Sequence, residues 1–215
     1  MIYTIKNKIF PSNTYIVSDQ KNSTCLIIDP GFDKALIEEK LVELNIIPIG
    51  ILSTHGHFDH IANVAYFQNK FTIPFFIHRG DLKVLNSANF FLKIAKIDQH
   101  IKIPKPNVIF EEKFEAISIG DFKLEIYNFP GHSDGGIIIK IGKNLFTGDL
   151  IYKSGLGFNN FPGEKKIILR ESIIEIFKIF GDDFSFFPGH GSSETIGFLK
   201  KHNLRLHEFL SQKQN

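Results

Sequence analysis

Four residues of the kind that bind metal ions stand close together in the segment 54–60, which reads THGHFDH. His55, His57 and His60 carry imidazoles and Asp59 a carboxylate, which are typical ligands of zinc and related divalent ions. In an extended segment, side chains two positions apart point the same way, so we expect His55 and His57 to converge on one point. Asp59 and His60 fall where the chain turns into a helix and can face a neighbouring point. The segment therefore predicts a metal site.

Three more residues of the same type stand beside glycines elsewhere in the chain. His132 lies in PGHS, Asp149 in TGD and His190 in PGHG, and each directly follows a predicted strand. Loops at the ends of strands on a rigid sheet commonly carry function. Taken singly, each would be read as a turn residue. Taken together with the segment 54–60, they are better explained as further ligands.

The elements that must position these residues can be read from the pattern of apolar side chains. Short β-branched and aromatic runs predict strands at 1–6, 13–18, 24–29, 49–53, 75–78, 117–119, 123–129, 136–141, 144–147 and 184–188. Apolar residues at helical spacing predict helices at 35–44, 61–67, 164–180 and 203–212. Two β-rich halves that each carry helices suggest an α+β protein whose two sheets pack face to face, with helices outside.

The composition of the chain limits the classes of protein to which it can belong. The 215 residues, 43% of them hydrophobic, are enough to bury a core, and we expect one domain over 1–215. A net charge of +2 argues against a nucleic-acid partner, and the single cysteine, Cys25, permits no intrachain disulfide. The N-terminal residues lack the pattern of a signal peptide. No stretch of the sequence approaches the roughly 18 consecutive apolar residues that are needed to cross a bilayer. We therefore expect a cytoplasmic protein with a small-molecule substrate and no membrane partner, in an oligomeric state that these features leave open.

These motifs resemble those of the metallo-β-lactamase superfamily. The details DPG at 29–31, PGHS at 130–133, GDLI at 148–151 and PGHG at 188–191 resemble its glyoxalase II-like (hydroxyacylglutathione hydrolase-like) branch, in a short form, and the likeness covers nearly the whole chain. It implies an αβ/βα four-layer sandwich, in which two mixed β-sheets are flanked by helices and the site lies at one edge of both sheets. It also implies two metal ions with Asp149 between them. One ion would take His55, His57 and His132, and the other would take Asp59, His60 and His190.

The chemistry expected of such a site is hydrolysis. Zinc is the favoured ion, with iron or manganese as alternatives, and it lowers the pKa of a bound water to about 7, so that a metal-bound hydroxide is available at neutral pH. Asp59 is the expected catalytic residue, because it would orient the water and shuttle its proton. Asp29 would either hydrogen-bond a ligand imidazole or shape the turn at 30–31, and both roles stay open.

The expected substrate is a small hydroxyacyl thioester, similar to lactoylglutathione. Tyr152, Lys153 and Phe158 follow Asp149 closely and are expected to line the substrate pocket. The resemblance places Phe158 where the glyoxalase II enzymes usually carry a basic residue, and the chain ends soon after His190 without their helical extension. Both features predict weak recognition of glutathione. The apolar stretch 89–97 is more typical of core packing than of a lid over the pocket.

Other functions share parts of this pattern of residues. A persulfide dioxygenase would use one iron and only His55, His132 and Asp149 among these residues, and a lactonase is a further alternative. An RNA-processing nuclease would need a basic surface or an added binding region, and a non-catalytic binding protein would be expected to lose ligands. A secreted β-lactamase is disfavoured because no signal peptide is seen. The sequence therefore favours a thioester hydrolase.

Overall fold

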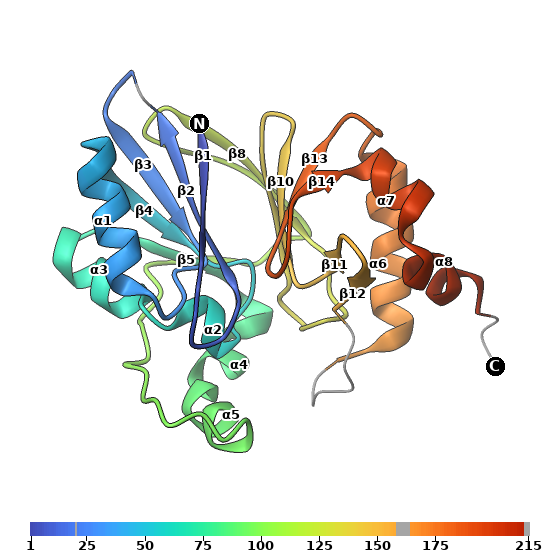
Figure 1. Ribbon diagram of the computed structural model, residues 1–215, viewed down its shortest axis with the longest axis horizontal. Coiled ribbons are helices and arrows are strands. Elements are labelled where there is room, and N and C mark those ends of the chain that lie inside the picture. The colour runs from blue at the N-terminus through green and yellow to red at the C-terminus, as the bar shows by residue number, and fades with distance from the viewer. Residues whose placement is uncertain (20, 158–163, 213–215) are drawn as a thin grey trace.

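The computed structural model describes residues 1–19, 21–157 and 164–212. Two six-stranded sheets face each other, and helices cover the outer side of each sheet (Figure 1). The order of layers is helix, sheet, sheet, helix. This is the αβ/βα four-layer sandwich that the resemblance implied, and it confirms the two facing sheets predicted from the pattern of elements.

The first sheet is built from the N-terminal half of the chain and has the strand order β1-β2-β3-β4-β5-β6. Its strands are β1 (Ile2–Lys6), β2 (Asn13–Asp19), β3 (Thr24–Ile28), β4 (Ile47–Leu52), β5 (Phe75–His78) and β6 (Val108–Phe110). The first three strands pair antiparallel, whereas β3 to β6 pair parallel. Because parallel strands need crossovers, helices separate β3 from β4 and β4 from β5.

The second sheet has the order β14-β13-β10-β9-β8-β7. Its strands are β7 (Phe114–Ile119), β8 (Phe122–Asn128), β9 (Ile137–Ile141), β10 (Asn144–Gly148), β13 (Ser185–Pro188) and β14 (Glu194–Thr195). Only β10 and β13 pair parallel, so this sheet is mixed as well. A two-stranded ribbon of β11 (Ile151–Tyr152) and β12 (Gly155–Leu156) follows β10.

Helices form the two outer layers. The first sheet is covered by α1 (Lys34–Leu44) and α3 (Val64–Phe71), and the second by α6 (Lys166–Ile179), α7 (Ile196–His202) and α8 (Leu204–Ser211). Short helices gather at one end of the sandwich in Figure 1, and they are α2 (Phe58–Ile61), the 3-10 turn η1 (Arg79–Asp81), α4 (Leu82–Asn86) and α5 (Ala88–Ile94). Within the described ranges, no helix is both long and apolar enough to pass through a membrane.

Alternation along the strands divides the apolar side chains among three layers of core. In β3, Cys25 and Ile27 pack toward α1 and α3, whereas Leu26 and Ile28 pack against the second sheet. In the second sheet, Phe146 of β10 packs in the layer between the sheets, whereas the preceding residue, Leu145, packs against the outer helices. Successive side chains of a strand point to opposite faces, so strands buried on both faces read as continuous apolar runs.

Two local expectations need correction near the segment 54–60. The predicted helix 61–67 is two helices, α2 and α3, because the Asn63 backbone N–H donates to the carbonyl of Pro30 at 3.0 Å and so leaves the helical ladder. The residues from 53 to 57 are not an extended strand either, since β4 ends at Leu52 and the chain bends at Thr54 and His55.

Candidate metal centre

Seven candidate ligands are brought to the same end of the two sheets. His55 and His57 lie in the loop after β4, and α2 carries Asp59 and His60. The second sheet supplies the rest from loops that directly follow β8, β10 and β13, namely His132, Asp149 and His190. The bends around His55, rather than the alternation of a strand, are what turn the first two imidazoles together.

His55, His57 and His132 form what we call the first ligand group. Their ligand-type nitrogens lie within 4.8 Å of one another, and His132 Nε2 is 2.9 Å from His57 Nδ1. The ring centroid of His55 is 4.7 Å from that of His57 and 4.9 Å from that of His132. Two loops from different sheets therefore aim three imidazoles at one point.

The second ligand group is Asp59, His60 and His190. Asp59 Oδ2 lies 3.2 Å from His60 Nε2 and 3.2 Å from His190 Nε2. Asp59 and His60 are buried, whereas His190 is partly exposed. This group again combines residues from both sheets.

Asp149 stands between the two groups. Its Oδ1 is 3.4 Å from His60 Nε2, and its Oδ2 is 3.3 Å from His190 Nε2. The same Oδ2 is 3.7 Å from His132 Nε2 and 4.0 Å from His55 Nε2. Asp149 therefore contacts both groups, as a bridging carboxylate would.

Hydrogen bonds on the far side of three imidazoles fix which nitrogen carries the proton. The Nδ1 atoms of His60, His132 and His190 lie against oxygens that can only accept, namely Asp29 Oδ2 at 3.1 Å, the carbonyl of Gly157 at 2.9 Å and the carbonyl of Pro11 at 2.5 Å. Each Nδ1 must therefore be protonated and donate. Nε2 of each ring faces the centre, so its lone pair is available to a metal ion once the ion displaces the Nε2 proton, which is the arrangement that metal-binding histidines adopt.

Asp29 lies behind this centre and makes both of the contacts that the sequence left open. Its carboxylate accepts Nδ1–H of His60, as well as the backbone N–H of Thr54 at 2.7 Å and the Thr54 hydroxyl at 2.6 Å. Its backbone takes a φ of 51°, which is uncommon for a residue other than glycine. Asp29 therefore shapes the turn after β3 and also orients His60.

Burial and neighbouring charges set the protonation of the cluster. Burial, reinforced by the nearby imidazole of His132, lowers the pKa of His57 to about 4. Burial alone would raise the pKa of Asp149, but the imidazoles of His60 and His190 outweigh it and hold that pKa well below its usual range. Burial also lowers the pKa of His190, yet Asp149 and Asp59 outweigh it and raise the pKa to about 10. The centre thus holds ionised carboxylates, which are good ligands.

The donor atoms fit a divalent cation. Four inward-facing atoms are buried without a hydrogen-bond partner in the described part of the chain: His55 Nε2, Asp59 Oδ2, His60 Nε2 and Asp149 Oδ1. Buried polar atoms without partners are costly, and cations held by the two ligand groups and Asp149 would satisfy all four. Zn–N bonds of about 2.0–2.1 Å place tetrahedral ligands about 3.3 Å apart. The distances of 3.2 to 3.4 Å around Asp59, His60 and Asp149 match that spacing.

A set of polar residues that the sequence did not point out holds the ligand loops in place. Asn13 Nδ2 donates to the carbonyls of Pro188 and Gly191, each at 2.9 Å, and the Tyr15 hydroxyl donates to the carbonyl of Pro188 at 2.5 Å. The Ser12 hydroxyl donates to the carbonyl of Asp59 at 2.8 Å. Strand β2 of the first sheet therefore carries the anchors for the His190 loop of the second sheet. The one sequence signal was a buried strand that starts with polar residues.

Glycine is required at one point of close approach. A Cβ at Gly189 would lie 1.9 Å from Asp149 Oδ1 and 2.7 Å from His60 Cε1. A side chain there would displace the carboxylate between the two ligand groups. The glycine before His190 in PGHG therefore follows from the packing of the centre.

The residues predicted to line the substrate pocket are only partly brought to the centre. The Tyr152 ring lies 5.8 Å from that of His190, and burial, reinforced by the negative charge of Asp149, raises the pKa of its hydroxyl. The described contacts of the Lys153 ammonium are with Glu194, at 2.6 Å, and with the ring of Phe198. Phe158 lies outside the described residues.

The apolar stretch 89–97, expected in the core, divides between core and surface. Leu92 of α5 is buried, whereas Phe90 is 62% exposed. Phe91 packs its ring 6.2 Å from that of His57, and so adds an aromatic wall beside the first ligand group.

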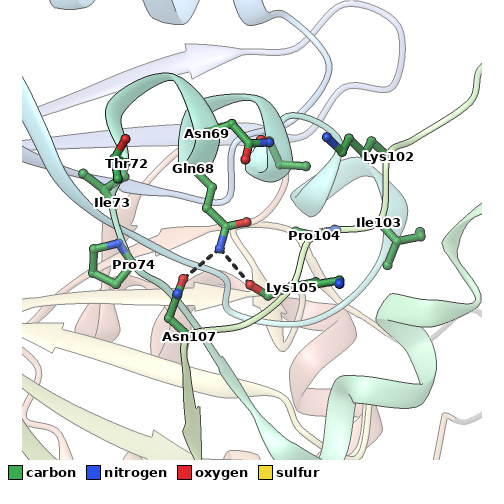
Figure 2. A pocket seen from close by; sticks show the side chains of 11 residues that line it. Gln68, Asn69, Thr72, Ile73, Pro74, Lys102, Ile103, Pro104, Lys105 and Asn107 are labelled. Carbon is green, nitrogen blue, oxygen red and sulfur yellow. Dashed lines mark hydrogen bonds between the residues drawn. The ribbon is translucent and has the colours of Figure 1, made fainter.

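One sizeable cavity lies apart from the candidate ligands. It measures about 650 Å³ between α3 and the segment 102–107, and no ligand candidate lines it. Figure 2 shows that Gln68 bridges this segment, donating to the carbonyl of Lys105 and to Asn107 Oδ1, each at 2.7 Å. This amide therefore ties α3 to the segment before β6, and the cavity is not the site of the chemistry.

Comparison with known proteins agrees with this geometry. A model of the metallo-beta-lactamase superfamily matches residues 8–200. The hydroxyacylglutathione hydrolase GloC of Haemophilus influenzae is 30% identical over 202 residues, which cover 90% of this chain and 92% of GloC. The BLEG-1 B3 metallo-beta-lactamase superposes with a TM-score of 0.87 at 28% identity, over 99% of this chain and 100% of that chain. TTHA1623 in a di-iron-bound form gives a TM-score of 0.83 at 25% identity, over 94% and 98% of the two chains. The chain is thus a metal-dependent hydrolase that belongs to the metallo-beta-lactamase superfamily.

Proposed function

We propose that this protein hydrolyses a small hydroxyacyl thioester at a centre of two divalent ions, with zinc as the favoured metal. The observation that carries the proposal is the set of seven ligand-type side chains whose donor atoms face one another, four of them buried without a hydrogen-bond partner in the described residues. The likeness to GloC, a hydroxyacylglutathione hydrolase, supports the substrate class. The likeness to a di-iron protein keeps iron as the alternative metal.

The first ligand group would hold one ion and the second ligand group the other, with Asp149 shared between them. A bound ion of this type polarises a carbonyl oxygen and lowers the pKa of a coordinated water to about 7. The far-side hydrogen bonds to Asp29, Gly157 and Pro11 keep Nε2 of these imidazoles directed inward, so the rings need to move little when an ion displaces the Nε2 protons.

Asp59 is the residue we assign to proton transfer. Hydrolysis joins the water oxygen to the thioester carbonyl carbon and breaks the carbon–sulfur bond. The water loses a proton, which the Asp59 carboxylate accepts and returns to the departing thiolate. Asp59 is 4% exposed and its Oδ2 faces His60 and His190, so it is held in the centre and shielded from bulk solvent.

In this proposal, Tyr152 and Phe91 lie beside the centre where the substrate would bind. The Tyr152 ring lies beside His190, and the Phe91 ring lies beside His57. An aromatic border of this kind suits the hydrocarbon part of a short hydroxyacyl group. Lys153 and Phe158 stay predictions as substrate contacts.

A panel of substrates tests the proposal with purified protein of known metal content. Lactoylglutathione, a short acyl thioester without glutathione, a lactone and a β-lactam are compared by steady-state kinetics, and a persulfide is tested by oxygen consumption. We expect metal-dependent cleavage of thioesters. Because Phe158 stands where a cation is usual, and a hydrogen bond to a charged group contributes about 1.5–3 kcal/mol, lactoylglutathione should show a high KM. A low-micromolar KM would refute weak glutathione recognition, and no cleavage of any thioester would refute the substrate class.

Hydrolysis of a β-lactam is the second candidate, because the BLEG-1 B3 metallo-beta-lactamase superposes on 99% of this chain at 28% identity. The same ions and the same proton transfer would open a β-lactam ring. If the β-lactam is cleaved with a kcat/KM above that of every thioester, this second candidate replaces the first.

A further inference from the structure

A buried carboxylate outside the ligand set connects the two loops of the first ligand group. Asp81 ends the 3-10 turn η1 after β5, and its side chain is 0% exposed. Its Oδ2 accepts the backbone N–H of Gly56 at 2.7 Å and the Ser133 hydroxyl at 2.9 Å, and its Oδ1 accepts the backbone N–H of Gly135 at 2.7 Å. One carboxylate therefore binds a loop of each sheet.

The positions of these donors relate Asp81 to the ligands. Gly56 stands between His55 and His57, and Ser133 follows His132. The distance between the two loops determines where His132 Nε2 stands relative to the imidazole of His57, and these nitrogens are 2.9 Å apart. Movement of either loop would therefore open the first ligand group.

The backbone around Asp81 is packed as tightly as its hydrogen bonds suggest. A Cβ at Gly56 would lie 2.9 Å from the Asp81 carbonyl oxygen, and a Cβ at Gly135 would lie 2.4 Å from the Asp81 nitrogen. A Cβ at Gly80 would lie 2.7 Å from the carbonyl of Asp134. Both loops thus approach the turn at glycines, where a side chain would hold them apart.

Stability alone does not account for a carboxylate in this place. Burying a charge costs free energy unless it is well paired, and in the described part of the chain the three polar partners of Asp81 are all neutral donors. An amide would be cheaper to bury, but it offers one acceptor oxygen and would turn its own N–H toward one of these donors. Only a carboxylate can accept all three hydrogen bonds.

We propose that Asp81 is a positioning residue that sets the spacing of the first ligand group and hence the affinity of one of the two metal positions. The proposal rests on the ligand assignment of the proposed function and not on its thioester substrate. The second ligand group has its own anchors, Asp29 behind His60 and Ser12 behind Asp59. Loss of Asp81 should therefore act on one position and spare the other.

The test measures cobalt(II) binding to the full-length, metal-free protein by calorimetry and by the visible absorption of the ion. In a His190→Ala background, the complete group is the first one, and in a His132→Ala background it is the second. We expect Asp81→Asn to weaken cobalt binding about 10–100-fold in the His190→Ala background, the usual loss when a residue that orients ligands is changed. In the His132→Ala background the affinity should change by less than about twofold, because the described hydrogen bonds of Asp81 go to Gly56, Ser133 and Gly135 and not to the second ligand group or its anchors.

A matched pair of serines gives a milder version of the same test, should Asp81→Asn fail to fold. Ser133→Ala removes one hydroxyl bond to Asp81, and Ser12→Ala removes one hydroxyl bond to the carbonyl of Asp59. We expect Ser133→Ala to weaken cobalt binding at the first ligand group, and Ser12→Ala to weaken it at the second. Equal losses in both backgrounds, or no loss in either, would overturn the positioning role. If the parent protein binds no cobalt, the ligand assignment fails, and the proposed function and this inference fail with it.

Discussion

Replacement of Asn13 by alanine should destabilise the protein measurably, although Asn13 is not a ligand. Asn13 is 2% exposed and donates to two carbonyls of the His190 loop, those of Pro188 and Gly191. The carbonyl of Pro188 keeps the Tyr15 hydroxyl as a partner, and Gly191 is exposed to water, so neither carbonyl is left fully unsatisfied. At about 1 kcal/mol for each net hydrogen bond, the loss in free energy of unfolding is about 2 kcal/mol.

Urea unfolding of the metal-free protein, followed by circular dichroism, measures this loss. A change of about 2 kcal/mol lowers the ratio of folded to unfolded protein by a factor of about 30. The control is Asn22→Ala, since Asn22 is an exposed asparagine whose amide also makes two hydrogen bonds, to Asp19 and to Asp121, but at the surface. Exposed substitutions of that kind usually stay within about 0.5 kcal/mol. An Asn13→Ala protein as stable as the control would refute the view that β2 anchors the His190 loop.

Three further predictions concern the centre and the core. Asp59→Ala should lower kcat by about 10²–10⁴-fold, the usual contribution of acid–base catalysis, and keep cooperative unfolding; near-normal turnover of the best substrate would contradict the role given to Asp59. Burial raises the pKa of the Cys25 thiol to about 12, so Ellman's reagent should leave Cys25 unmodified in the folded protein at pH 8 and modify it after unfolding in urea. Equal rates in both states would show that the thiol is accessible. Zinc at 100 times its dissociation constant should stabilise the folded protein by about 2.7 kcal/mol for one site, which a thermal melt with and without a chelator detects; identical melts would contradict a metal-linked fold.

The sequence predicted what depends on local pattern. The hairpin of β7 and β8 and that of β9 and β10 were found because glycines that take positive φ, Gly120 and Gly142, mark their turns. The amphipathic stripe of α6 was found because its buried residues recur at helical spacing. Short elements such as α5 and α7 were missed, since seven residues give too little periodicity to distinguish a helix from a loop.

The candidate site, like the fold, could be predicted only where local pattern marks it. The ligand-type residues were recognisable because each stands beside a glycine or within one short segment at a strand end. The residues that hold them were not, because their contacts join distant parts of the chain: Asn13 bonds a carbonyl 175 positions away, and Asp81 bonds residues 25 and 54 positions away. No spacing in the sequence records such pairings.

The metal content of the purified protein tests the central claim most directly. The protein is freed of metal, reconstituted separately with zinc, iron and manganese, freed of excess ion and measured by elemental analysis against protein concentration. The two ligand groups with Asp149 between them predict two ions for each chain with at least one of these metals. No bound metal after any of the three reconstitutions would contradict the assignment of the seven residues as ligands, and a single ion with every metal would contradict a two-ion centre.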